Sequence, residues 1–177
     1  MRTGALHINR LKEFRGCLIM KTKIQWKPLL VSVAISLGVG ILSSLFTPNI
    51  AGEYAAIPDP PLAPPAWLFP VVWTILYILM GIAAYLIWES APGEEKRSAL
   101  LYYGAQLVIN FFWPLIFFRM DAYVTAFFWL LLLWYLVFVT FQKFYAINPT
   151  AGKLLIPYLV WLTFAGYLNL YIAIATL

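Results

Sequence analysis

The sequence predicts an all-α integral membrane protein that folds as a bundle of five transmembrane helices. Of its 177 residues, 63% are hydrophobic and 11% are charged, whereas a soluble domain is typically about 25% charged. The chain therefore has too few polar residues to cover a surface that faces water. Its apolar segments approach the length of about 20 residues at which a helix crosses a bilayer. They lack the strict alternation of membrane β-strands, which favours helices over a barrel.

The chain divides into a basic tail and a membrane domain. Residues 1–27 carry seven Lys or Arg against one Glu, and we predict that they are disordered. The alternative is a surface helix that lies on anionic lipid, and a start at Met20 would leave residues 1–19 outside the native protein. Residues 28–177 form the membrane domain. Its five spans are predicted at about residues 28–47, 66–88, 98–118, 122–144 and 154–175.

Small side chains recur every four residues along the first span, at Ser32, Ser36, Gly40 and Ser44. Residues at this spacing share one helix face. In lipid, such a face lets another helix approach closely. We expect it to pack, within the bundle or across a dimer, rather than to contact a ligand.

A proline-rich loop leads into the second span. Because proline fixes φ and lacks an amide donor, this loop is stiff and not helical. It continues into a charge-free apolar run that carries Trp73 and Tyr77 on one face. A stiff loop beside an aromatic helix suits a lid over a flat apolar ligand. Prolines also occur within the second, third and fifth spans, where we expect kinked or opened helices, at Pro70, Pro114 and Pro157.

Polar side chains within the spans are few, and two of them share one face of the third span. Gln106 and Asn110 are four residues apart, and Trp113 follows three residues later. Because an amide that faces lipid is costly, this face is predicted to point into the bundle. Interhelical hydrogen bonding and ligand contact are both open there. The fifth span has the same four-residue spacing at Trp161, Ala165 and Asn169.

The chain contains eight tryptophans, which have two predicted uses. Trp26 and Trp67 lie at span ends, where interfacial anchors occur. Trp73, Trp113 and Trp161 lie inside their spans, on faces that carry other polar or small groups. These three are candidates for the wall of a pocket, with core packing as the alternative.

The basic residues predict the orientation of the chain. The tail, the second loop and the fourth loop share one side and hold eleven Lys or Arg, whereas the other side holds only Arg119. By the positive-inside rule, the N-terminus is cytoplasmic, and the first loop and the C-terminus lie outside. The expected location is a bacterial cell membrane.

Composition excludes several kinds of site. The only histidine is His7 and the only cysteine is Cys17, both in the tail. The spans therefore offer no metal site and no Ser-His-Asp arrangement. The sequence has no phosphate-binding loop and no nucleic-acid patch, so we expect neither a cofactor nor a nucleic-acid partner. Any chemistry would come from aromatic side chains or from the ligand.

Three segments carry a resemblance to a known family: PPLAPPAWLFPVVWTILYILMG, QLVINFFWPLIFF and LLIPYLVWLTFAGYLN. In this order, they resemble the TspO/translocator protein family, also called tryptophan-rich sensory proteins or peripheral-type benzodiazepine receptors. The resemblance covers about residues 26–175. It implies a five-helix bundle, usually a homodimer, with a pocket that opens towards the first loop. Members bind porphyrins such as protoporphyrin IX, and some bind sterols or benzodiazepine-type ligands.

The motifs, together with the polar face of the third span, imply a ligand-binding set. Its members are Tyr54, Pro64, Trp73, Tyr77, Gln106, Asn110, Trp113, Trp161, Ala165 and Leu168. Trp73 and Trp161 match the tryptophans that are associated with porphyrin breakdown in some bacterial members, so they would be the catalytic residues of an enzyme. Leu62 departs from the family, which has Trp there, and no basic residue follows Lys153, so the sterol-recognition pattern is not carried over.

The leading hypothesis is a membrane receptor for porphyrins with a role in tetrapyrrole sensing, transport or regulation. One alternative is an enzyme that degrades porphyrin with light and oxygen. The other is a passive translocator of lipid or other hydrophobic ligands. The sequence has no internal repeat and no charge clearly inside a span, which argues against coupled transport. The expected partners are a planar hydrophobic ligand, the bilayer and a second copy of the chain.

Overall fold

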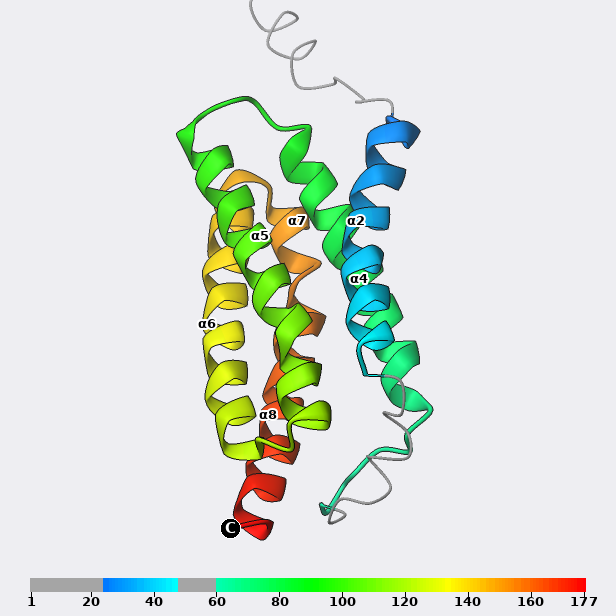
Figure 1. Ribbon diagram of the computed structural model, residues 1–177. Coiled ribbons are helices and arrows are strands. Elements are labelled where there is room, and N and C mark those ends of the chain that lie inside the picture. Colours follow the sequence, from blue (N-terminus) through cyan, green and yellow to red (C-terminus); the bar gives the residue numbers. More distant parts are fainter. Residues whose placement is uncertain (1–23, 48–59) are drawn as a thin grey trace, which may run out of the picture.

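The computed structural model describes residues 24–47 and 60–177, which form a bundle of long helices (Figure 1). Within these ranges, five helices are long and apolar enough to cross a membrane, and there is no strand. The elements are α2 Trp26–Leu45, α4 Leu68–Trp88, α5 Glu94–Pro114 with its π-helical continuation η1 Leu115–Arg119, α6 Tyr123–Ile147, the short α7 Pro149–Lys153 and α8 Ile156–Ala175. The predicted all-α membrane fold is confirmed.

Two segments that the sequence placed in loops are helical. α5 begins at Glu94 rather than near Ser98, and its first turn carries Glu94 and Glu95. Carboxylates are favourable there because the N-terminus of a helix is the positive end of its dipole. The residues after α6 form α7, which is capped by Asn148. The Asn148 Oδ1 accepts hydrogen bonds from two backbone amides of α7, over 3.0 and 3.3 Å, as N-cap residues commonly do.

The prolines within the spans act in two ways. Pro114 lies inside α5 and is followed by the π-helical residues of η1, so the helix opens there as predicted. Pro70 and Pro157 are instead the third residue of α4 and the second residue of α8. In a first turn the missing amide costs no hydrogen bond, so the predicted kink at Pro70 is wrong. The fifth span does open at Pro157, as predicted, because the turn at Leu154 and Leu155 separates α7 from α8 just before this proline.

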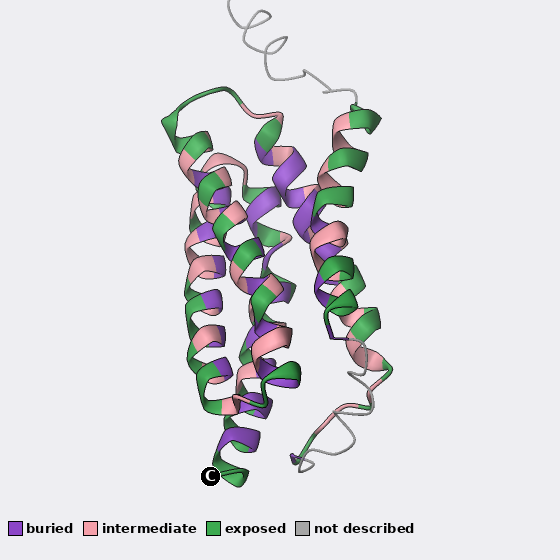
Figure 2. Ribbon diagram, in the orientation of Figure 1, coloured by how far each residue is buried: buried purple, intermediate pink, exposed green. Residues whose placement is uncertain are grey.

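The helices form two groups that meet in the core. α2 packs on α4, while α5 packs on α6 and α6 on α8 (Figure 1). Contacts of α2 with α5, and of α4 with α7, join the groups. Buried residues line the faces between helices, and exposed residues cover the outside (Figure 2). α2 is the most exposed span, since its only buried residues are Ser36 and Ser43, and its apolar outer face is expected to meet lipid.

The two ends of the bundle hold different segments. The start of α2, the α4–α5 connection and α7 lie at one end, and the C-terminus lies at the other end, at which α4 starts (Figure 1). This is the arrangement that an odd number of spans requires. Trp26 and Trp67 are each 66% exposed at span ends, as interfacial anchors would be. The assignment of the first end to the cytoplasm stays a prediction.

The stripe of small side chains on α2 packs within the bundle. The Ser32 hydroxyl donates to the backbone carbonyl of Gly81 over 2.8 Å, and Ser36 Oγ lies 2.6 Å from the Tyr103 hydroxyl on α5. A Cβ at Gly40 would meet the ring of Tyr77. Packing, rather than ligand contact, is therefore the role of these positions. The fourth member, Ser44, is exposed and bonds to its own helix.

Candidate functional site

A hydrogen-bonded network of side chains joins α4, α5 and α8 in the core. The Tyr77 hydroxyl donates to Asn110 Oδ1 over 3.0 Å, and Asn110 Nδ2 donates to the Tyr158 hydroxyl. The Tyr158 hydroxyl donates to Gln106 Oε1 over 3.3 Å. Gln106 Nε2 in turn approaches Met80 Sδ at 3.7 Å. The network thus begins and ends on α4, after passing through α5 and α8.

This network is closed to solvent. Gln106, Asn110 and Tyr158 are each at most 2% exposed, and Tyr77 is 7% exposed. A buried polar group must be hydrogen-bonded to avoid a large desolvation penalty, and here each amide is bonded across a helix interface. The amide face of α5 therefore points into the bundle, as predicted, and interhelical hydrogen bonding is its role in the structure.

Tyr158 is a central member of this network that the predicted set omits. Its hydroxyl accepts from Asn110 and donates to Gln106, and its side chain is 1% exposed. The residue does stand in the third motif, LLIPYLVW, three positions before Trp161. That motif was the available signal, although spacing alone does not show which helix a tyrosine will meet.

Trp73 lies against this network through ring contacts. Its ring centroid is 5.7 Å from that of Tyr77 and 6.0 Å from that of Tyr158, the latter edge-to-face. These distances fall within the range of favourable aromatic pairs. The Trp73 side chain is only partly buried. The network therefore fixes one edge of an indole that is itself partly exposed.

Trp161 has different neighbours. Its ring contacts Phe69 of α4 at 5.8 Å and Phe164 of α8 at 5.7 Å between centroids. The indole nitrogen Nε1 is buried, and it has no acceptor among the described residues. An unsatisfied buried donor is rare in folded proteins and calls for an explanation. Trp161 therefore presents a hydrogen-bond donor that no residue in the described ranges uses.

Trp113 belongs to a second aromatic cluster, which also contains Ala165. The Trp113 ring stacks on Phe117 with 5.0 Å between centroids, and both pack with Ala165 in one core cluster. The Trp113 Nε1 also lacks an acceptor among the described residues. The predicted ligand-binding set is thus divided. Trp73, Tyr77, Gln106 and Asn110 meet in the network, whereas Trp113 and Ala165 lie in the second cluster.

The remaining members of the predicted set lie on α8 and in the first loop. Leu168 is buried on α8, and Pro64 is half-buried just before α4. Tyr54 lies outside the described residues, so its predicted role is untested. The end of the loop is fastened to α8, because the Tyr167 hydroxyl donates to the carbonyl of Pro61 over 2.9 Å. Leu62, beside it, has a positive φ of 69° and is 82% exposed.

Two hollows lie at opposite ends of the bundle. One, of about 480 Å³, lies between the end of α4 and the start of α5. The other, of about 260 Å³, lies at the start of α6 beside the C-terminus. No residue of the predicted ligand-binding set lines either one. Among residues 24–47 and 60–177, no group of three or more His, Cys, Asp or Glu side chains could hold a metal ion.

Comparison with known proteins assigns the family. The sequence matches the TspO/MBR family over residues 32–175. It is 36% identical over 143 residues to the tryptophan-rich protein TspO of Chlorobaculum tepidum, which covers 80% of this chain and 90% of that relative. It is 35% identical over 131 residues to protein CrtK of Rhodobacter capsulatus, covering 73% and 81% of the two chains. It is also 35% identical over 147 residues to the translocator protein of Homo sapiens, covering 81% and 87%. The chain is thus an integral membrane protein that belongs to the TspO/MBR family.

Proposed function

We propose that this chain is a membrane receptor for porphyrins of the protoporphyrin IX type, with a role in tetrapyrrole sensing, transport or regulation. The observation that carries the proposal is the Trp161 indole, whose buried Nε1 has no acceptor among the described residues. A ligand that stacks on aromatic rings and offers a hydrogen-bond acceptor would use both properties of this side chain. A porphyrin has a flat apolar macrocycle and carboxylate groups, so it meets both requirements.

Trp73 provides the second aromatic surface of the proposed site. The network of Tyr77, Asn110 and Tyr158 holds its position. A side chain held in place before binding loses little conformational entropy on binding. Each aromatic contact with the macrocycle would add ~0.5–1.5 kcal/mol, and burial of apolar area adds about 25 cal/mol per Å². The macrocycle enters from the first-loop end, where the Phe69 ring, now packed on Trp161, has to move aside.

A porphyrin titration of the purified protein tests the proposal. Binding is followed through the absorbance of protoporphyrin, because the eight tryptophans make emission alone ambiguous. We expect saturable binding that weakens about tenfold in Trp73→Phe plus Trp161→Phe, which corresponds to ~1.4 kcal/mol. Trp26→Phe is the matched control, since Trp26 is 66% exposed at the start of α2. An unchanged affinity in the double variant would place the ligand elsewhere.

Light-dependent porphyrin breakdown is a second candidate, favoured by the ring contacts of Trp73 with two tyrosines. The same two indoles, Trp73 and Trp161, would then be the oxidisable groups next to the excited macrocycle. Illumination of the protein with protoporphyrin in air separates this activity from binding. Bleaching that is faster than in detergent alone, and that slows in Trp73→Phe plus Trp161→Phe, supports an enzyme. Bleaching at the detergent rate removes that candidate and leaves the receptor.

We also propose that the protein is a homodimer in the bilayer. The support is the resemblance of its motifs to a family that is usually dimeric. Cross-linking of the full chain in vesicles, at decreasing protein-to-lipid ratios, tests this. If, on dilution in lipid, the fraction of cross-linked protein falls to the level expected from chance encounters, the homodimer proposal is contradicted.

A further inference from the structure

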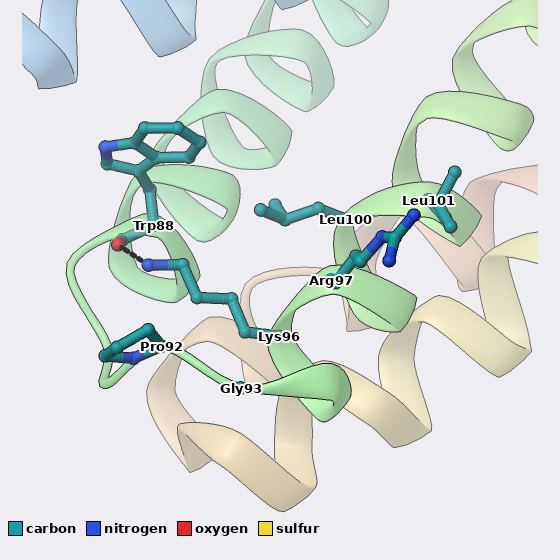
Figure 3. A pocket seen from close by; sticks show the side chains of 7 residues that line it. All are labelled: Trp88, Pro92, Gly93, Lys96, Arg97, Leu100 and Leu101. Carbon is teal, nitrogen blue, oxygen red and sulfur yellow. Dashed lines mark hydrogen bonds between the residues drawn. The ribbon is translucent and has the colours of Figure 1, made fainter.

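An open hollow lies at the end of the bundle opposite to the aromatic site. It has a volume of about 480 Å³ and is lined by Trp88, Pro92, Gly93, Lys96, Arg97, Leu100 and Leu101 (Figure 3). The lining comes from the last residue of α4, the connecting loop and the first two turns of α5. The hollow therefore lies where two spans leave the hydrocarbon layer, at the depth of lipid headgroups.

One side of the hollow is cationic. Lys96 is held over the end of α4, because its Nζ donates to the carbonyls of Trp88 and Ser90 and lies 5.2 Å from the centroid of the Trp88 ring. These partners are neutral, so the charge of Lys96 is not cancelled by a carboxylate. Its position is fixed by bonds within the protein, which leaves a localised positive charge at the wall.

Arg97 supplies the second cation. Its contact with Glu94 is long, at 4.0 Å, and joins two side chains that are 76% and 90% exposed. An ion pair this exposed is worth little and is easily exchanged for a better partner. Glu94 and Glu95 are nearby carboxylates, but neither lines the hollow. The Arg97 guanidinium is therefore available for a phosphate, which it can bind with two parallel hydrogen bonds.

The other side of the hollow is apolar and faces outwards. Trp88 is 61% exposed and Leu101 is 64% exposed, and Leu100 lies between them in the close-up view (Figure 3). A soluble anion would gain nothing from these side chains. An amphiphile whose phosphate meets the cations can lay its acyl chains along them. Tryptophan at this depth is also the residue that commonly meets lipid headgroups.

We propose that this hollow binds the headgroup of an anionic phospholipid, with the phosphate on Arg97 and Lys96 and the acyl chains along Trp88, Leu100 and Leu101. The site is independent of the proposed porphyrin site, since the two share no residue. The bound lipid would come from the leaflet at that end of the bundle, where the α4–α5 connection lies. Its occupant would hold the ends of α4 and α5 together, because it contacts both helices.

Mass spectrometry of the intact protein, released from detergent with its bound lipids, tests the proposal. Delipidated full-length protein is titrated with dioleoylphosphatidylglycerol, with dioleoylphosphatidylcholine, and with inorganic phosphate. We expect one saturable site for phosphatidylglycerol, which should bind more tightly than phosphatidylcholine and should not be displaced by inorganic phosphate. Since a basic residue near anionic lipid contributes about fivefold in affinity, Arg97→Gln should lower the affinity for phosphatidylglycerol about fivefold. Arg97→Lys should retain most of it.

Lys153→Gln is the matched control. Lys153 is exposed on α7 at the same end of the bundle, but it does not line the hollow. Both substitutions remove one surface charge, and neither residue is buried, so both variants should fold. A loss confined to Arg97→Gln supports a defined site. Equal losses in the two variants, equal binding of the two lipids, or displacement of the lipid by inorganic phosphate would each overturn the proposal.

Discussion

The Tyr77 hydroxyl donates a hydrogen bond to Asn110 Oδ1 over 3.0 Å, and this bond ties α4 to α5 inside the bundle. The same ring contacts Trp73 at 5.7 Å between centroids and lies directly against Gly40 of α2. One side chain therefore connects three helices to an indole of the proposed porphyrin site. Changes that disturb Tyr77 should affect both the stability of the bundle and ligand binding.

Tyr77→Phe removes the hydroxyl and leaves Asn110 Oδ1 buried without this donor. Interhelical hydrogen bonds in membrane proteins average ~0.6 kcal/mol, and an unsatisfied buried acceptor costs ~1–3 kcal/mol. We expect a loss of about 0.6–2 kcal/mol in the free energy of unfolding, seen as a lower Tm in detergent. Tyr135→Phe is the control, because Tyr135 is 58% exposed. Equal Tm values for both variants would mean that the bond from Tyr77 to Asn110 adds no stability.

Gly81→Ala tests how closely α2 and α4 approach each other. A Cβ at Gly81 would lie 2.5 Å from the Cα of Val33, so the two backbones would have to separate. Overpacking of this kind costs about 1–3 kcal/mol. At Gly104, nothing lies within 4 Å of an added Cβ, and Gly→Ala inside a helix is favourable by up to about 1 kcal/mol. Thermal unfolding should thus move in opposite directions in the two variants. A stable Gly81→Ala protein would contradict the tight helix contact.

The sequence was sufficient for the fold because the hydrophobic runs alone determine which segments cross a membrane. Periodicity also identified the buried face of α5, since Gln106 and Asn110 share one side of the helix and are at most 2% exposed. Both inferences depend on properties within one segment. They require no knowledge of which helices become neighbours.

The site was predicted less completely, because its contacts depend on the register between helices. Tyr158 lies in the motif LLIPYLVWLTFAGYLN of the fifth span, yet only the packing of α8 brings its hydroxyl to Asn110 and Gln106. In the same way, helical spacing does not separate Trp113, which stacks on Phe117, from Trp73, which contacts Tyr77. The role of Pro70 was missed for another reason. Whether a proline kinks a helix depends on where that helix begins, and α4 begins only two residues earlier.

Gly40→Ala should weaken porphyrin binding through Tyr77. The added Cβ would collide with the Tyr77 ring, which must then shift relative to Trp73. A displacement that costs about 1 kcal/mol would weaken binding roughly fivefold. Gly38→Ala is the matched control on the same helix, since nothing lies within 4 Å of its added Cβ. Titration of both variants with protoporphyrin measures the effect. Equal affinities of the two variants would mean that the position of Tyr77 does not influence ligand binding.

Tyr167→Phe should loosen the end of the first loop without loosening the bundle. The Tyr167 hydroxyl donates to the carbonyl of Pro61 over 2.9 Å, and Tyr167 is 41% exposed on α8. A hydrogen bond of this kind contributes ~0.5–1.5 kcal/mol net. If the loop closes over the proposed site, its loss should speed porphyrin dissociation roughly two- to tenfold, because the bond must break before the ligand leaves. Stopped-flow displacement of bound protoporphyrin measures this rate.

The control is Tyr171→Phe, which alters a tyrosine one turn further along α8 and should leave the dissociation rate unchanged. The Tm of both variants should stay close to that of the unaltered protein. Equal dissociation rates in all three proteins would mean that this loop contact does not retain the ligand.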